Sequence, residues 1–98
     1  MSFVQIIDAR TKNFDEINAL DAEYEKSVAG RSTFRRSIAC RDRNDPERYF
    51  ILVFFDSYED AMQNSTLPET QALAEKMMGL VEAPPSFYDL DIIEDKSF

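Results

Sequence analysis

The chain has 98 residues, of which 44% are hydrophobic and 31% charged, with only two glycines and four prolines. This composition fits one folded domain over residues 1–98 and excludes disordered, collagen-like and linker-rich classes. Nineteen acidic against 11 basic residues give a net charge of −8. Because that charge repels phosphate backbones and anionic lipid headgroups, we expect no binding to nucleic acid or to membranes.

The residue types that are missing limit the chemistry. The chain has no histidine and no tryptophan, which removes the usual general base and the commonest metal ligand. Its single cysteine, Cys40, cannot form an internal disulfide, and no stretch has the form of a signal peptide or of a membrane span. We therefore expect a cytoplasmic protein without a metal site or a cofactor.

The first third of the chain predicts a strand followed by a helix. Residues 3–10 (FVQIIDAR) are rich in β-branched residues and end in polar ones, which is typical of a strand. Asn13 and Glu16 have the spacing of a helix cap, and Gly30 supplies a stop. Between them, apolar residues recur at helical spacing: Phe14, Ile17, Leu20, Tyr24 and Val28.

Residues 33–42 and 48–56 predict the two strands of a β-hairpin, because the turn-forming cluster RNDPE at 43–47 separates them. Ser57 with Asp60 then predicts a capped short helix through about Asn64.

A third helix is predicted from Thr66 and Glu69, which repeat the capping spacing, with Pro68 tolerated in the first turn. Residues 83–86 (APPS) end it, and residues 87–94 (FYDLDIIE) predict a last strand. The apolar stripe of this helix consists of Leu73, Ala74, Met77 and Val81.

The predicted order is β-α-β-β-α-β with the second helical region split in two. This is the ferredoxin-like α+β arrangement, in which helices cover one face of a four-stranded antiparallel sheet. Both alternating sets of the third strand are apolar: Tyr49, Ile51, Val53 and Phe55 on one side, and Phe50, Leu52 and Phe54 on the other. Since a bare apolar face is a liability, we expect a homodimer whose sheets pack face to face.

Residues 54–92 carry a resemblance to a known family. A strand ends in a Ser, acidic, acidic, Ala helix start at 57–61, an Asn-Ser-x-x-Pro break follows at 64–68, and a Pro-x-Phe-x-x-x-Asp strand lies at 85–91. In these features and in element order the chain resembles the antibiotic-biosynthesis-monooxygenase-like branch of the dimeric α/β-barrel superfamily. The resemblance implies a dimer with a small-molecule pocket between helices and sheet in each subunit.

The superfamily includes cofactor-independent oxygenases of aromatic polyketides, haem-degrading oxygenases, isomerases and proteins with no assigned reaction. The haem-degrading members use a histidine and a tryptophan, and this chain has neither. Asn64 is similar to the asparagine that the quinone-forming members carry on their second helical region, whereas their tryptophan has no counterpart.

Arg35 and Arg36 are adjacent in a predicted strand, so regular alternation places one of them on each face. An arginine on a covered face needs an anionic partner. That partner is either an enolate, phenolate or carboxylate substrate, or an acidic side chain across the dimer; we predict Arg36 as the catalytic arginine and Arg35 as a pocket residue.

Tyr24 and Asn64 are the other predicted catalytic residues, with ordinary packing of Tyr24 and helix capping by Asn64 as the alternatives. Tyr49, Met62 and Met77 are predicted to line the pocket, with core packing as their alternative.

Two functions remain open. The first is a cofactor-independent monooxygenase or isomerase acting on a small aromatic, polyketide-like or acidic molecule, whose deprotonated form the polar groups stabilise. The second is a non-catalytic dimer that binds a metabolite or supports another protein.

Overall fold

The structure, a computed structural model, describes residues 2–98. Its strands form one antiparallel sheet in the order β2-β3-β1-β4, which confirms the predicted ferredoxin-like fold. The elements are β1 (Phe3–Arg10), α1 (Phe14–Ser27), β2 (Phe34–Arg41), β3 (Arg48–Phe55), α2 (Tyr58–Ser65), α3 (Pro68–Met78) and β4 (Ser86–Asp91).

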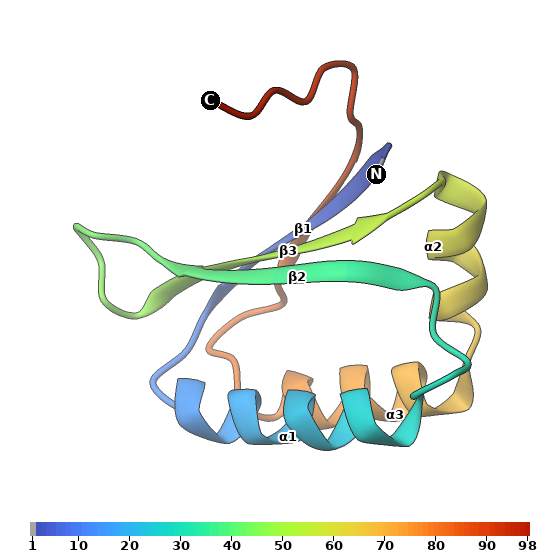
Figure 1. The fold of residues 1–98 in the computed structure, drawn as a ribbon. Coiled ribbons are helices and arrows are strands. Elements are labelled where there is room, and N and C mark those ends of the chain that lie inside the picture. The colour runs from blue at the N-terminus through green and yellow to red at the C-terminus, as the bar shows by residue number, and fades with distance from the viewer. Residues whose placement is uncertain (1) are drawn as a thin grey trace.

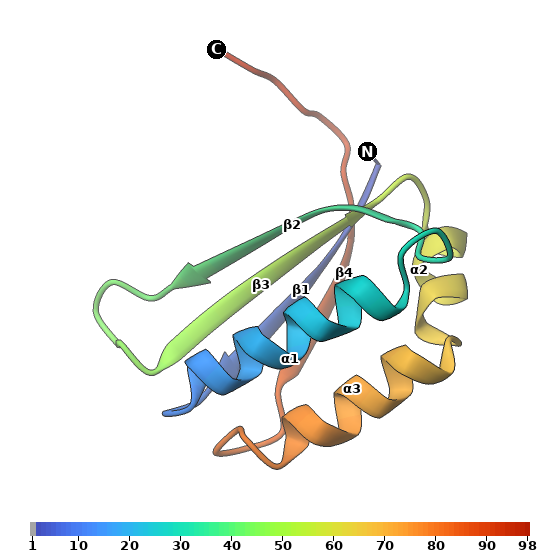
Figure 2. The ribbon, with the colours of Figure 1, turned by 60° about the horizontal axis from the view of Figure 1, so that its bottom comes forward.

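The molecule has two layers. Figure 1 shows α1 and α3 beneath one face of the sheet, with α2 at the end of the sheet where β3 stops. Figure 2 shows α1 and α3 running side by side across that face. In neither view does a helix of the described chain cover the opposite face, so one side of the sheet is left open. No helix within residues 2–98 has the length and apolar character to cross a membrane.

The start of α1 differs in detail from its prediction. Asn13 occupies the N-cap position, but its side chain makes no capping hydrogen bond. The Thr11 hydroxyl oxygen accepts from the Asn13 N–H at 2.9 Å, and that hydroxyl donates to the Leu80 carbonyl at 2.5 Å. Thr11 is fully buried. Its two hydrogen bonds join the start of α1 to the loop that follows α3.

The predicted cap of α2 is confirmed, because the Ser57 hydroxyl oxygen accepts from the Asp60 N–H at 3.1 Å. The predicted cap of α3 at Thr66 is wrong. Thr66 ends α2, where its hydroxyl donates to the Gln63 carbonyl at 2.7 Å, and Leu67 is the N-cap of α3.

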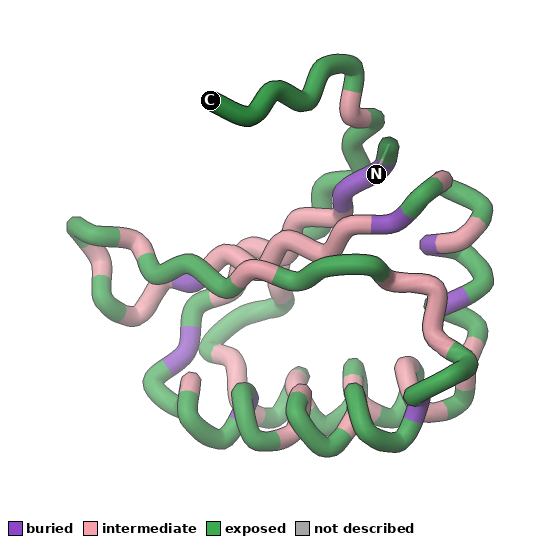
Figure 3. Tube along the Cα trace, in the orientation of Figure 1, coloured by how far each residue is buried: buried purple, intermediate pink, exposed green. Residues whose placement is uncertain are grey.

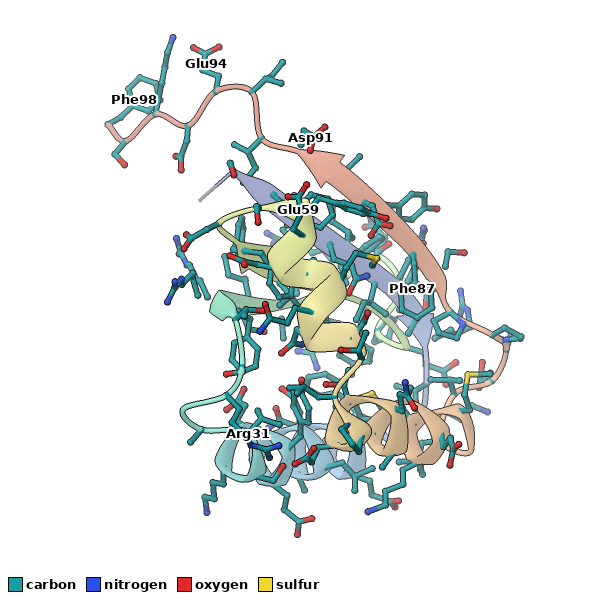
Figure 4. All side chains as sticks on the ribbon, turned by 90° about the vertical axis from the view of Figure 1, so that its right-hand side faces the viewer. Arg31, Glu59, Phe87, Asp91, Glu94 and Phe98 are labelled. Carbon is teal, nitrogen blue, oxygen red and sulfur yellow. The ribbon has the colours of Figure 1, made fainter. Side chains whose placement is uncertain are left out.

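The second half of the chain also has shorter elements than predicted. The helix α3 ends at Met78, so Val81 of the predicted apolar stripe lies in the following loop. The last strand ends at Asp91 rather than Glu94, and Figure 4 shows Glu94 and Phe98 on a tail that leads away from the sheet.

The core lies where β1, β3 and α2 meet. Phe3, Phe55 and Ala61 are each at most 5% exposed, and Phe34 and Val53 pack against them. Between its two ends β3 is of intermediate burial, as Figure 3 shows. Tyr49, near the other end, is buried under Phe14. The layer between sheet and helices is thus packed at both ends and more loosely filled between them.

We predict that Phe55→Ala lowers the free energy of unfolding by about 3–5 kcal/mol, because it leaves a cavity among buried aromatic side chains. Urea denaturation followed by circular dichroism measures this change. The control is Phe98→Ala, on the exposed tail, for which we expect a change within about 0.5 kcal/mol. Equal effects of the two substitutions would contradict the position of the core.

Candidate functional site

Two adjoining cavities lie between the sheet and the helices. The inner cavity has a volume of about 110 Å³, and a second one, the apolar lobe, has about 180 Å³. They share six lining residues: Gln5, Ile7, Ile51, Thr70, Leu73 and Met77. Joined, they approach the lower end of the size range of small-molecule sites, about 300 Å³.

The inner cavity combines apolar walls with polar groups from five elements. Its walls are Ile7 of β1, Phe34 of β2, three side chains of β3, and Leu73 and Met77 of α3. The polar lining residues are Gln5, Asp21, Tyr24, Glu25, Ser37, Asn64 and Thr70. An apolar pocket with a few converging polar groups is the usual form of a small-molecule site.

Tyr24, Asn64 and Thr70 are joined by hydrogen bonds although they belong to three different helices. The Asn64 amide donates to the Tyr24 hydroxyl oxygen at 3.0 Å, and the hydroxyl groups of Tyr24 and Thr70 are 2.7 Å apart. Either hydroxyl can donate in the Tyr24–Thr70 hydrogen bond; when Tyr24 donates, the Thr70 hydrogen is left for a ligand. The three side chains form a hydrogen-bonded chain that ends at the cavity.

A neighbouring ion pair at the surface, between Arg31 and Glu69, links two of the helices that carry these side chains. Arg31 follows α1 and also donates to the Ser27 carbonyl at 2.7 Å, while Glu69 lies in the first turn of α3 beside Thr70. The pair therefore joins the end of α1, where Tyr24 lies, to the start of α3.

Asn64 has one amide atom without a partner. The side chain is only 8% exposed, and its Oδ1 atom makes no hydrogen bond with any described residue. Buried polar atoms without a partner are rare in folded proteins. Asn64 lines the inner cavity, so a ligand with a donor group is the natural partner for this oxygen.

Asp21 and Glu25 bring two carboxyl groups to the inner cavity from successive turns of α1. Burial raises the pKa of Asp21 from its usual 3.8 to about 6, and the adjacent Glu25 carboxylate adds to the rise. Of the residues that line this cavity within the described chain, none is basic. An acid with a pKa near neutrality in a cavity is a candidate for proton transfer.

The predicted placement of the arginines is wrong, and a bulge in β2 is the reason. The pairing of β2 with β3 shifts between Phe34 and Arg36, so Phe34 and Ser37 both line the inner cavity. Arg36 is turned to the open face, with its guanidinium 5.9 Å from the centre of the Phe54 ring. Arg35 pairs at the surface with Asp56 at 2.8 Å, so neither arginine reaches the cavity.

The other predicted site residues differ in which cavity they line. Tyr24, Asn64 and Met77 line the inner cavity, and Met77 also lines the apolar lobe. Tyr49 lines only the lobe, where its ring stacks on Phe14 with the ring centres 4.1 Å apart. Met62 lies on the exposed side of α2 and lines neither cavity.

Sequence reasoning missed Asp21, although the chain holds a signal for it. Asp21 lies four residues after Ile17 and three before Tyr24, so it falls on the apolar stripe of α1. An acid on the stripe that faces a sheet is the exception to amphipathic patterning. Thr70 is found only from the structure, because its role depends on the meeting of α1, α2 and α3. Within residues 2–98, no three Cys, Asp or Glu side chains lie together as a metal site would need.

We predict that Asp21→Asn stabilises the protein at pH 7–8 by on the order of 1 kcal/mol, because the charged carboxylate is disfavoured in the cavity and only partly screened by solvent. The native state binds the Asp21 proton more readily than the unfolded state between pH 3.8 and about 6. The contribution of Asp21 to wild-type stability therefore falls as pH rises through that window. The difference in free energy of unfolding between the wild type and Asp21→Asn vanishes below about pH 4. Thermal unfolding across pH 3.5–8 measures it, with Glu23→Gln on the exposed side of α1 as control. A constant difference at all pH values would contradict the assignment.

Comparison with known proteins supports the fold. No protein-family model matches the chain, and no curated protein matches it. Among solved structures, SnoaB, a cofactor-independent oxygenase from Streptomyces nogalater, matches with a TM-score of 0.81 at 12% identity, over 96% of this chain and 95% of that chain. A provisionally named antibiotic biosynthesis monooxygenase from Caulobacter crescentus matches with 0.81 at 14% identity, over 95% and 91%.

A provisionally named antibiotic biosynthesis monooxygenase from Chloroflexus aurantiacus matches with a TM-score of 0.74 at 18% identity, over 99% of this chain and 98% of that chain. At these identities the matches establish the fold alone. The chain therefore has, over its whole length, the fold of structures that carry the antibiotic biosynthesis monooxygenase name, which confirms the resemblance seen in the sequence.

Proposed function

We propose that the protein is a cofactor-independent monooxygenase that acts on a small, neutral aromatic molecule carrying a hydroxyl group. The observation that carries this proposal is the donor chain from Asn64 through Tyr24 to Thr70, which ends in a cavity with apolar walls. Its fold is shared with SnoaB, a cofactor-independent oxygenase, which supports the same class of reaction.

The lining of the cavity favours a neutral substrate over an anionic one. Asp21 and Glu25 repel a carboxylate or phosphate, and within the described chain no basic side chain lines the cavity to offset them. Phe34 and the apolar side chains of β3 suit an aromatic ring. This replaces the arginine-anchored acidic ligand expected from the sequence.

The proposed chemistry needs only dioxygen as co-reactant. A phenol loses its hydroxyl proton, and the electron-rich ring carbon of the phenolate attacks dioxygen. One oxygen atom remains as a new carbonyl, the other leaves as water, and the original hydroxyl becomes the second carbonyl of a quinone. The substrate supplies all the electrons, so the protein has to hold the phenolate, for which the Thr70 hydroxyl at the end of the donor chain is placed.

We predict that the purified protein consumes dioxygen with naphthol and anthrone substrates, and that Thr70→Val lowers kcat/KM about 100-fold because it removes the terminal donor. Tyr24→Phe, which breaks the donor chain, is expected to lower it about 10-fold or more. An oxygen electrode and detection of the quinone by absorbance provide the measurement.

The matched control is Thr66→Val, the same change at an exposed threonine outside both cavities. It should leave the rate unchanged. Tight binding of these substrates without oxygen consumption would reject the oxygenase and support a non-catalytic binding protein.

We also propose that a second copy of the chain covers the open face of the sheet. That face carries eight apolar side chains, of which Tyr88 and Leu90 on β4 are 48% and 46% exposed in the single chain. The others are Val4, Ile6, Ile38, Phe50, Leu52 and Phe54.

The size and charge of the open face both suit a twofold dimer. Four strands of about eight residues give a face on the order of 500 Å² before side-chain relief is added, near the roughly 600 Å² per partner of small specific interfaces. Its charged residues include Asp8 and Arg48, whose ion pair (2.9 Å) neutralises both. Hydrogen bonds from Arg48 lower the pKa of Asp8, so the pair stays ionised at neutral pH.

We predict that the protein sediments with twice the mass of one chain at micromolar concentration, and that Leu52→Asp converts it to a monomer because a carboxylate is buried in the interface. Tyr88→Asp tests the same face at a side chain that is already half exposed, so folding of the single chain does not depend on it. Gln71→Asp on the exposed side of α3 is the control and should stay dimeric. A wild-type monomer would overturn the proposal.

A further inference from the structure

The carboxyl groups of Asp21 and Glu25 are not part of the hydrogen-bond chain proposed to hold the phenolate. Both side chains line the inner cavity from α1, one helical turn apart; Asp21 is partly buried and Glu25 is exposed. The only other titratable group on the lining is Tyr24, also from α1; within the described chain, strands β1 to β3 and helices α2 and α3 contribute no charged group to it. A partly buried carboxylate without a cation beside it is costly.

A second feature of the same cavity points to a ligand. The Oδ1 atom of Asn64 is buried without a partner, and Asn64 itself is 8% exposed. This oxygen and the two carboxyl groups are acceptors, and the hydroxyl groups of Ser37 and Thr70 are the small donors beside them on the lining. Such a cavity is satisfied by a molecule that brings its own hydroxyl hydrogens.

We propose that Asp21 is the general base that takes the proton from the phenolic or enolic hydroxyl of the neutral substrate. This inference rests on the proposed function and adds its proton acceptor. The O–H bond of the substrate breaks, the proton goes to an Asp21 carboxylate oxygen, and the electron pair stays on the substrate oxygen. A phenolate or enolate and a protonated Asp21 result, and no oxidant takes part in this step.

The protonation state of Asp21 suits the role of a base. Burial and the neighbouring carboxylate of Glu25 raise its pKa to about 6. At pH 7 and above Asp21 is therefore ionised and ready to accept a proton, and it is a stronger base than an ordinary aspartate.

The first test uses binding of 2-naphthol, measured by its fluorescence, between pH 4.5 and 8. We expect the wild-type affinity to rise about 10-fold as pH passes through about 6, because a carboxylate is a stronger acceptor than a carboxylic acid. Asp21→Asn should remove this rise, and Glu25→Gln should move it to lower pH, since it removes the like charge beside Asp21. Glu23→Gln, an acid on the same helix outside the inner cavity, should leave it in place.

The second test is oxygen uptake by the same variants. In the wild type, log kcat/KM should rise with pH up to about 6 and then level off. In Asp21→Asn this rising limb of the pH profile should be absent, and kcat/KM should be at least 100-fold lower. A variant Asp21→Asn that keeps the limb and the rate overturns the inference and leaves the oxygenase standing. A normal binding profile without any oxygen uptake rejects the oxygenase, whereas it supports Asp21 as the acceptor of the ligand hydroxyl.

Discussion

The central strand β3 is apolar on both faces, and the rest of the structure depends on covering it. Tyr49, Ile51, Val53 and Phe55 face the helices, and Phe50, Leu52 and Phe54 face the other way. Phe3 and α2 close the end near Phe55, and Phe14 covers Tyr49 at the other end. Because α1 and α3 span the remainder without filling it, space is left along Ile51 and Val53. The same strand thus forms the floor of the candidate site on one face and an unpaired apolar surface on the other.

One extra residue in β2 decides which polar groups reach that space. Regular alternation from Phe34 would turn Arg36 toward the helices and Ser37 away from them. The bulge reverses both, so a small hydroxyl replaces a guanidinium on the cavity wall. Arg36 then lies over Phe54 on the open face. The loss of that positive charge leaves Asp21 and Glu25 as the charged groups on the lining within the described chain, which is the basis for proposing a neutral substrate.

The order of elements was predictable because periodicity and turn residues are local signals. Residues 3–10 and the two strands of the hairpin lie within a residue of their predicted bounds, and Ser57 caps α2 as expected. The errors arise where tertiary contacts override local pattern. Thr66 ends α2 because Leu67 and Pro68 begin the next helix, and the bulge beside Arg35 leaves no mark in the sequence. Tyr24 and Asn64 could be named as candidates, but their hydrogen bond needs two helices to meet. Asp21 does carry a local signal, because an acid between Ile17 and Tyr24 on the apolar stripe of α1 departs from amphipathic patterning.

An acid on that stripe has a physical cost that bears on its role. A leucine at position 21 would pack against the sheet and stabilise α1, whereas the carboxylate is disfavoured at neutral pH, as its raised pKa shows. The hydrogen-bond chain through Tyr24 does not offset this loss of stability, because the chain is complete without Asp21. Local strain of this kind is typical of sites where function opposes stability. The net charge of −8 acts in the same direction, because it repels anions before they reach the cavity. In the proposed reaction, a substrate that arrives neutral and becomes an anion only after giving its proton to Asp21 avoids both repulsions on entry, and the neutral quinone meets neither on leaving.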